Sequence, residues 1–229
     1  MEENKKYESD KGTPQGGLIS PILANVYLHY VLDLWIEKDI KKRYHGEVFE
    51  IRFADDFVVC FEFEKEAKQF LKELKERLAK FGLEMEETKS KIVKFGKTCY
   101  GNKETFDFLG FTHINDKTKT GHYKVVHKTS KKKIKAKKII VKEWIKENRH
   151  IAINKLIEKL NIKLLGHYRY YGISDNSDKL QEFMRYITVT LFKQLRRRGQ
   201  KHKLTWEKYL RILKYNPIVQ PKIYISLYN

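Results

Sequence analysis

Two β-forming runs that flank a pair of adjacent acidic residues set the strongest limit on how this chain folds. Residues 48–53 and residues 57–61 are rich in aromatic and β-branched residues, and Ala54-Asp55-Asp56 lies between them. This pattern predicts a β-hairpin with carboxylates at its turn. Because both runs are almost continuously apolar, we expect strands that are buried on both faces.

Apolar residues with helical spacing precede this hairpin. They run from Leu23 to Leu34 and predict a helix that ends near Glu37. Ser20 is the expected N-cap of this helix, and Pro21 is expected at its first position.

A second helix and two further strands are predicted after the hairpin. The apolar row over residues 67–81 predicts a helix that Gly82 terminates. Short strands are expected over residues 92–95 and residues 106–111. Together these elements predict an α+β layer, an antiparallel sheet with two helices, over residues 1–114.

The second half of the chain has a different composition. Residues 115–130 are polar and are expected to form a linker, either a loop or a poorly ordered hairpin. Helical patterns begin at Lys131, and a last short helix is expected between an N-cap at Thr205 and Asn216-Pro217. We therefore expect a basic α-helical bundle over residues 131–229.

The excess positive charge lies entirely in the second half. The 229 residues carry a formal net charge of +19. Residues 1–114 hold 19 basic and 21 acidic residues, whereas residues 115–229 hold 29 basic and 8 acidic residues. Such self-repulsion costs stability unless a polyanion offsets it, which favours a nucleic-acid partner. The alternative is a lysine-rich solvated surface of the kind that an AT-rich genome encodes.

The sequence shows neither a membrane span nor a secretory signal. It has no run of 18 apolar residues, and its N-terminus is polar and charged. The two cysteines, Cys60 and Cys99, form no CxxC pair and no disulfide framework. We therefore expect a cytoplasmic protein with no membrane partner.

Asp55 and Asp56 are the sharpest candidates for chemistry. Adjacent carboxylates repel each other and are best tolerated where a cation neutralises them. Mg²⁺ prefers hard oxygen ligands and shares its other positions with water and phosphate, and a pair of such ions can assist phosphoryl displacement. The alternative is a solvated acidic turn without a ligand, since aspartate favours turns.

A glycine-rich segment precedes the first predicted helix and reads Gly12-Thr13-Pro14-Gln15-Gly16-Gly17. Glycines let the backbone approach another molecule closely, and a helix N-terminus offers free amides to phosphate. The segment is not a Walker loop, because no Gly-Lys-Ser/Thr follows it.

Four motifs, taken in order, resemble those of the reverse transcriptases of group II introns. They are Pro14-Gln15-Gly16-Gly17-Leu18-Ile19-Ser20-Pro21, Phe53-Ala54-Asp55-Asp56, residues 82–89, and Phe106-Asp107-Phe108-Leu109-Gly110-Phe111. The last of these is similar to the family's primer-side strand. Downstream, residues 166–172, Arg196-Arg197-Arg198 and Thr205-Trp206 resemble the family's thumb and maturase region.

The resemblance implies a partial polymerase palm, followed by a thumb and maturase region, and RNA-directed DNA synthesis. It implies that Asp55 binds catalytic Mg²⁺ and that Asp56 supports it. It assigns contacts with the template and the incoming nucleotide to Pro14, Gln15, Gly16, Gly17 and Lys89. The implied partners are group II intron RNA, an RNA/DNA primer–template and deoxynucleotide triphosphates.

One feature of the family is not found before Pro14. The family's palm carries another metal-binding aspartate on a strand well upstream, whereas Asp10 lies close to the motif in a polar segment. We therefore expect the isolated chain to lack polymerase activity and to need an N-terminal reverse transcriptase fragment as a partner.

Basic and aromatic residues are interleaved in the second half, as in surfaces that bind RNA. The residues expected to contact RNA are Lys131, Lys132, Lys133, Lys137, Lys138, Tyr168, Arg169, Arg196, Arg197 and Arg198. The alternatives are solvated helix faces for the charges and core packing for the tyrosines. His167 is expected to pack in the core or to contact phosphate.

Two functional classes remain open. In the first, the chain is the C-terminal part of an RNA-directed DNA polymerase, catalytic only with an N-terminal complement. In the second, it is a non-catalytic RNA-binding maturase that assists splicing, and its acidic hairpin is idle. A plain DNA-binding bundle is a weaker reading, because it explains neither residues 14–17 nor the acidic hairpin.

Overall fold

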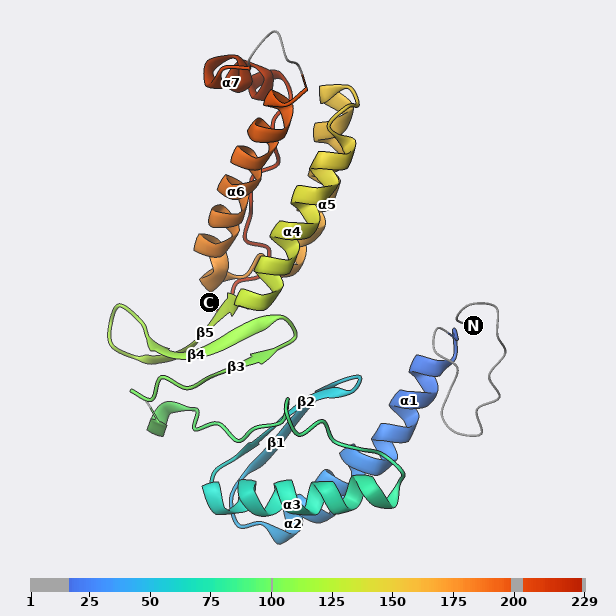
Figure 1. The fold of residues 1–229 in the computed structure, drawn as a ribbon. Coiled ribbons are helices and arrows are strands. Elements are labelled where there is room, and N and C mark those ends of the chain that lie inside the picture. Colours follow the sequence, from blue (N-terminus) through green and yellow to red (C-terminus); the bar gives the residue numbers. More distant parts are fainter. Residues whose placement is uncertain (1–16, 100, 199–203, 228–229) are drawn as a thin grey trace. The chain divides into compact units, whose positions relative to one another are not determined.

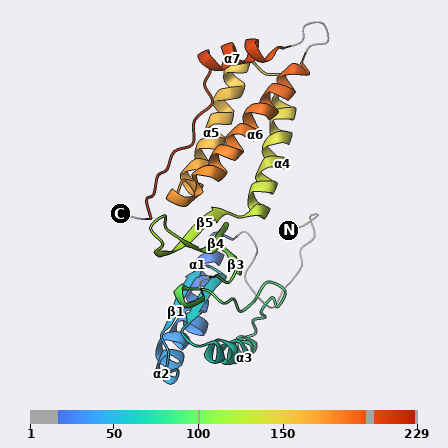
Figure 2. The ribbon, with the colours of Figure 1, turned by 90° about the vertical axis from the view of Figure 1, so that its left-hand side faces the viewer.

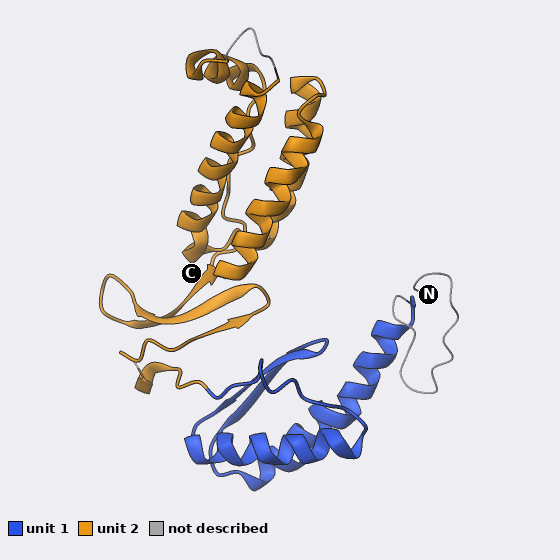
Figure 3. Cartoon of the chain, in the orientation of Figure 1, with its two compact units in different colours: residues 1–92 blue, residues 93–229 orange. Residues whose placement is uncertain are grey.

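The chain divides into two compact units, residues 1–92 (unit 1) and residues 93–229 (unit 2) (Figure 3). The computed structural model describes residues 17–99, 101–198 and 204–227. Within these residues the chain forms helices and two antiparallel sheets (Figure 1), which confirms the expected α+β class.

From residue 17 on, where the description of unit 1 starts, the main feature is one long helical segment. It comprises α1 (Ser20–Leu28), the π-helical stretches η1 (His29–Asp33) and η2 (Ile36–Ile40), and α2 (Lys41–Arg43). The segment continues past the predicted end near Glu37, because Leu32, Ile36 and Ile40 extend the buried row at intervals of four residues.

The start of this segment also differs from the prediction. Ser20 is the first helical residue rather than the N-cap, and Ile19 holds the N-cap position without a side-chain hydrogen bond. The reason is local: the Ser20 amide already donates to the Gly17 carbonyl at 3.2 Å, so a turn precedes the helix.

The predicted hairpin is confirmed. Strand β1 (Val48–Phe53) pairs antiparallel with β2 (Asp56–Phe61), and the pairing of Phe53 with Asp56 leaves Ala54-Asp55 as a two-residue turn.

The two faces of the hairpin differ in burial. One face packs Val48, Phe57, Val59 and Phe61 against the helices of unit 1. On the other face Phe49, Ile51 and Phe53 remain 58%, 60% and 65% exposed. The expectation of strands buried on both faces is therefore wrong for the described residues, because apolar partners cover only one face.

Helix α3 (Glu64–Lys80) follows the hairpin and ends as predicted at Gly82. Gly82 has φ +65°, and the amides of Gly82 and Leu83 donate to the carbonyls of Ala79 and Leu78 at 3.0 and 2.9 Å. This pair of bonds is the Schellman arrangement, whose left-handed residue is one that glycine provides without strain.

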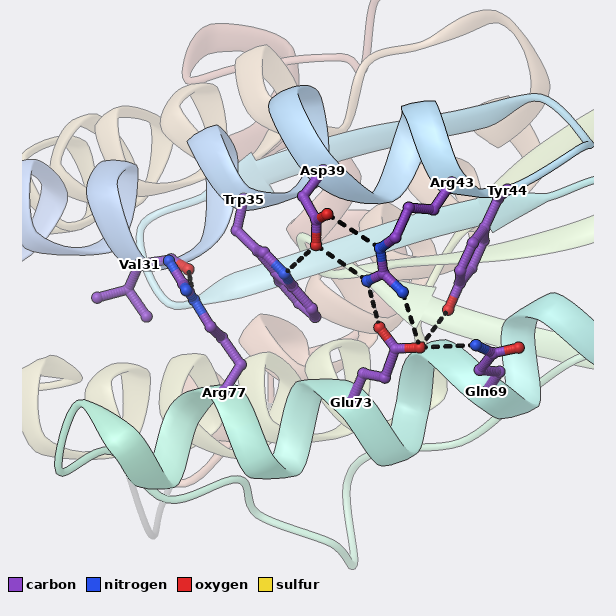
Figure 4. Close-up of polar contacts among 8 residues, drawn as sticks. All are labelled: Val31, Trp35, Asp39, Arg43, Tyr44, Gln69, Glu73 and Arg77. Carbon is purple, nitrogen blue, oxygen red and sulfur yellow. Dashed lines mark hydrogen bonds and ion pairs between the residues drawn. The ribbon is translucent and has the colours of Figure 1, made fainter.

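A polar network joins the first helical segment to α3 (Figure 4). Through its Nη2 atom, Arg43 contacts the carboxylates of Asp39 at 2.9 Å and Glu73 at 2.6 Å. Arg77 on α3 donates to the carbonyl of Val31 at 3.0 Å. Beside this network lies the apolar core of unit 1, formed by Val31, Leu32, Ile36, Ile40, Tyr44, Val48, Phe70, Leu74 and Leu78. The hairpin is thus held on packed helices.

The structure shows no strand at residues 92–95, where the sequence predicts one. This part of the described chain has irregular backbone, which leads into the 3₁₀ turn η3 (Lys97–Cys99). The short apolar run there finds no neighbouring strand with which to pair.

Unit 2 begins with a three-stranded antiparallel sheet whose strands lie in chain order. They are β3 (Thr105–Phe108), β4 (Phe111–Lys117) and β5 (Tyr123–Thr129). The strand predicted over residues 106–111 is therefore a hairpin, with its turn at Leu109-Gly110.

Residues 115–130, predicted as a linker that is either a loop or a poorly ordered hairpin, form the end of β4 and the whole of β5, so the hairpin alternative is confirmed and the linker is not. Lys124 and Lys128 make this segment look like a polar loop, but both bind Asp175 in the same unit, Lys124 its carboxylate and Lys128 its carbonyl. The sheet thus belongs to the same compact unit as the helices, and the chain passes from unit 1 to unit 2 between residues 92 and 93.

The remainder of unit 2 is the predicted helical bundle. Its elements are α4 (Lys131–Asn148), α5 (Ile153–Tyr171), the 3₁₀ turn η4 (Ser174–Asn176), α6 (Ser177–Arg196) and α7 (Trp206–Tyr215), with α4, α5 and α6 lying alongside one another (Figures 1 and 2). The Thr205 hydroxyl accepts from the Lys208 amide at 3.3 Å, which confirms the predicted cap, and α7 ends before Asn216. The core of the bundle contains the fully buried residues Leu160, Phe183 and Leu191.

A buried asparagine joins the sheet to the bundle. Asn176 accepts from the Thr129 amide at 2.8 Å and donates to the Thr129 hydroxyl at 2.7 Å. Its amide also donates to the carbonyl of Tyr171 at 2.9 Å. Three hydrogen bonds from one fully buried side chain therefore fix the end of β5 to the junction between α5 and α6.

Candidate active site and nucleic-acid interface

The acidic turn of unit 1 presents two adjacent carboxylates to solvent. Asp55 lies in the turn and Asp56 begins β2, and both residues are exposed. Neither side chain has a hydrogen-bond or ion-pair partner among the described residues. Ala54, just before them, has φ +55°, a left-handed conformation that costs a non-glycine residue free energy. Such backbone needs support from its surroundings.

Arg52 supplies that support. Its Nε and Nη2 atoms donate to the two carboxylate oxygens of Asp33 at 2.6 and 2.7 Å. Its Nη1 atom donates to the Ala54 carbonyl and to the side-chain oxygen of Asn25, both at 2.9 Å. The guanidinium is mostly buried and therefore ties the acidic turn to both α1 and η1.

Glu50 lies two residues before Arg52 on the same face of β1. Its Oε1 atom is buried without a partner among the described residues. Burial, followed by the nearby negative charge of Asp33, raises the pKa of Glu50 to about 7. The packed face of the hairpin thus holds a carboxyl whose pKa is shifted towards neutral pH by burial.

The acidic turn offers part of a metal site. Asp55 and Asp56 provide the hard oxygens that Mg²⁺ prefers. In the part of the chain that the structure describes, no group of three or more histidine, cysteine, aspartate or glutamate side chains is arranged to hold a metal ion. Asp55 and Asp56 would supply two oxygens to a bound ion, and water, phosphate or further oxygen ligands would have to supply the rest.

The structure describes only some of the other residues that are predicted to contact the template and the nucleotide. Pro14, Gln15 and Gly16 lie outside the described residues. Gly17 closes the turn before α1 through its carbonyl. Lys89 is exposed in a turn after α3, in the same unit as the acidic hairpin.

The basic residues of unit 2 fall into two groups. Lys131, Lys132, Lys133, Arg169, Arg196 and Arg197 are exposed, and Lys137 is partly exposed. Lys138 instead binds Glu182 at 2.8 Å and lies 5.3 Å from the centre of the Tyr186 ring. Arg198 donates to the Ile151 carbonyl at 2.7 Å. Two of the predicted RNA contacts thus have structural partners inside the unit.

Tyr168 does not fit its predicted role in RNA binding. Its side chain has no exposed surface, because it lies in the apolar core of the bundle. Neighbouring His167 is also buried, its ring centroid lies 4.5 Å from that of Phe183, and burial lowers its pKa to about 4. Core packing is therefore the outcome for both residues.

Comparisons with known proteins find a match for each half of the chain. A family model described as reverse transcriptase (RNA-dependent DNA polymerase) matches residues 1–113, and one described as group II intron, maturase-specific domain, matches residues 131–213. The group II intron-encoded protein LtrA of Lactococcus lactis subsp. cremoris, including strain MG1363, is 24% identical over 292 aligned positions that cover 93% of this chain.

The chain belongs to the group II intron reverse transcriptase and maturase family. It spans about half the length of the curated relatives that it matches, 47% in each case. The reverse transcriptase match ends inside β4, whereas the compact units divide at residues 92–93. Strands β3 and β4 therefore lie in the same compact unit as the helical bundle.

Among the described residues, no helix is both long enough and apolar enough to cross a membrane.

Sequence reasoning missed Arg52 and its partners. The available signal was a single arginine on the inward-facing positions of a strand, because Arg52 alternates with the outward-facing Ile51 and Phe53. A charged residue at such a position needs a partner, but the sequence alone does not say that Asp33 and Asn25 supply it.

Proposed function

We propose that this chain carries the catalytic turn of an RNA-directed DNA polymerase and binds group II intron RNA through its second unit. The observation that supports the first part most strongly is the turn itself. Exposed Asp55 and Asp56 follow a strained Ala54 whose carbonyl is held by Arg52. A solvated acidic turn without a role needs no such anchor.

The proposed reaction is attack of a primer 3′-hydroxyl on the α-phosphate of a deoxynucleotide triphosphate, with pyrophosphate as the leaving group. Asp55 holds Mg²⁺, and Asp56 adds negative charge beside it. When bound, the metal ions stabilise the charge that develops on the attacking and leaving oxygens. Arg52 keeps the turn in one geometry and does not touch the substrate.

The remaining site residues enter this proposal through the family likeness. Gln15 and Gly16 contact the template–nucleotide pair, and exposed Lys89 attracts the triphosphate. The exposed lysines at the start of α4 and Arg196-Arg197 at the end of α6 bind RNA phosphates. An N-terminal reverse transcriptase fragment supplies the upstream metal-binding aspartate.

The test is RNA-templated primer extension by the chain co-expressed with an N-terminal fragment of a group II intron reverse transcriptase. We expect cDNA synthesis from the pair, none from either part alone, and a loss of at least about 10³-fold with Asp55→Ala. Exposed Glu76→Ala on α3 in the same unit is the matched control and should leave synthesis unchanged.

The same experiment separates the polymerase from the splicing helper. RNA binding with no synthesis from the co-expressed pair contradicts the catalytic proposal and supports a non-catalytic maturase. Synthesis that survives Asp55→Ala also contradicts it, because another group must then hold the metal.

A further inference from the structure

The turn between β3 and β4 has an unusual backbone. Leu109 has φ +48° and Gly110 has φ +81°, so both residues of this two-residue turn are left-handed. Such turns match the twist of a hairpin, but their first position normally carries asparagine, aspartate or glycine. Leucine in this conformation is strained and persists only where neighbouring groups hold it.

Two neighbouring tyrosines at the end of α5 provide those groups. The Tyr170 hydroxyl donates to the Leu109 carbonyl at 2.8 Å. The Tyr170 ring stacks on Phe111, the residue after the turn, with centroids 5.9 Å apart, and the Tyr171 ring lies 5.1 Å from the same ring.

The absence of a side chain at Gly110 leaves room for the tyrosines. A Cβ atom at Gly110 would lie 2.7 Å from the Tyr171 hydroxyl oxygen, closer than real contacts allow. The Gly110 carbonyl also accepts from the Ser130 amide, at the N-cap of α4, at 2.9 Å. The end of α5 and the start of α4 thus meet at this turn, and all of these elements lie in one compact unit.

We propose that Tyr170 and Tyr171 are positioning residues that set the primer-side turn between β3 and β4, so that the helical bundle and residues 106–111 act as one rigid piece. This inference rests on the proposed function and on the resemblance of residues 106–111 to the family's primer-side strand. The interleaved tyrosines, which the sequence suggests as RNA-stacking groups, thereby act on the turn instead. Tyr168, with no exposed surface, supports the inward role of this stretch.

The test compares Tyr170→Phe, which removes only the hydroxyl, with Tyr215→Phe, whose tyrosine is 83% exposed in the same unit. The first readout is amide hydrogen exchange at Ser130 in the full chain, because its N–H bonds the turn directly. We expect exchange about 3–10-fold faster in Tyr170→Phe, as loss of one hydrogen bond predicts, and unchanged exchange in Tyr215→Phe.

The second readout is the dissociation constant for a fluorescent RNA/DNA primer–template duplex, expected to rise about 3–10-fold in Tyr170→Phe. Leu109→Gly keeps the left-handed turn without strain, so in that background the effect of Tyr170→Phe should shrink for both readouts. If Tyr170→Phe acted only by lowering the global stability of unit 2, its effect would be the same with leucine and with glycine at position 109.

Unchanged Ser130 exchange in Tyr170→Phe overturns the inference, and so does faster exchange with unchanged duplex affinity. An effect of Tyr170→Phe that is equally large with and without the Leu109→Gly substitution also overturns it. Failure of the proposed function has a different signature, since it appears as a wild-type chain that yields no cDNA with its complement.

Discussion

Asp33 and Arg52 form a two-point ion pair, with Nε and Nη2 of the arginine 2.6 and 2.7 Å from the two carboxylate oxygens. The pair joins η1 to β1, and the hydrogen bond to Arg52 lowers the pKa of Asp33. The same guanidinium also holds the Ala54 carbonyl. The geometry of the acidic turn therefore depends on Asp33, which lies 19 positions before Arg52 in the chain.

Arg52→Ala should therefore destabilise unit 1 by about 2–4 kcal/mol, since it leaves Asp33 partly buried without its partner. Arg52→Lys should recover only part of this, because an ammonium group cannot form the two-point contact. Urea unfolding followed by circular dichroism measures both changes.

The control for Arg52 is Lys68→Ala, which breaks the exposed helical pair of Lys68 with Glu64. It should cost less than about 0.5 kcal/mol. Equal and small losses from Arg52→Ala and Lys68→Ala would mean that the arginine does not anchor the turn.

Glu50 makes the stability of unit 1 depend on pH. Because burial raises its pKa from 4.5 to about 7, the folded protein keeps the proton to a higher pH than the unfolded chain. The stability from this group is complete below pH 4.5 and is lost as the pH rises through 7.

Glu50→Gln should therefore stabilise unit 1 at pH 8 by about 1–2 kcal/mol, and by much less at pH 4. Denaturant unfolding at both pH values tests this, with exposed Glu76→Gln as the control for removing one negative charge. A gain that is equal at pH 4 and pH 8 contradicts the assignment.

Asn176 should hold the sheet and the helical bundle of unit 2 in one cooperative structure. Asn176→Ala leaves the buried Thr129 amide without an acceptor and should cost about 2–4 kcal/mol. Differential scanning calorimetry should show one transition for unit 2 in the wild type. The control is Gln181→Ala at an exposed position on α6, which should change the stability of unit 2 little. Separate melting of sheet and helices in the wild type would contradict a single unit.

Local signals predicted much of this fold. The two almost continuously apolar runs and the acidic break between them predicted the hairpin, Gly82 predicted the end of α3, and Thr205 predicted the start of α7. Each of these depends on residues close in the sequence, where propensity and capping act directly.

The missed features depend on distant partners. The sequence allowed a hairpin over residues 115–130 but did not show that β5 packs within unit 2. Lys124 and Lys128 make this segment look solvated, and only the approach of Asp175 makes these lysines compatible with a packed strand. The exposed face of β1 was missed because Phe49 and Ile51 look like core residues in any sequence. At the candidate site, the acidic pair was visible in the sequence, whereas its anchor, Arg52, required the tertiary structure.

Substitution of an exposed lysine of α4 should lower the affinity for RNA more than substitution of Lys138, which is ion-paired. Lys133→Ala should weaken RNA binding and reduce the salt slope by about 1, as expected for one lost phosphate contact. Lys138→Ala, on the same helix, should change the slope less and instead remove the ion pair with Glu182. Fluorescence anisotropy between 50 and 200 mM salt measures the slopes, as about 6–10 contacts predict a 10³–10⁵-fold loss over this range. A flat salt dependence for the wild type contradicts RNA binding by this unit.

The most direct test of the central claim is a manganese titration of the whole chain, followed by paramagnetic broadening of its amide NMR signals. If Asp55 and Asp56 hold a divalent cation, the signals of residues 54–57 broaden at the lowest metal concentration, and Asp55→Asn abolishes this while the fold is kept. If other acidic positions broaden first, or if Asp55→Asn leaves the turn signals equally broadened, the acidic turn is not a metal site.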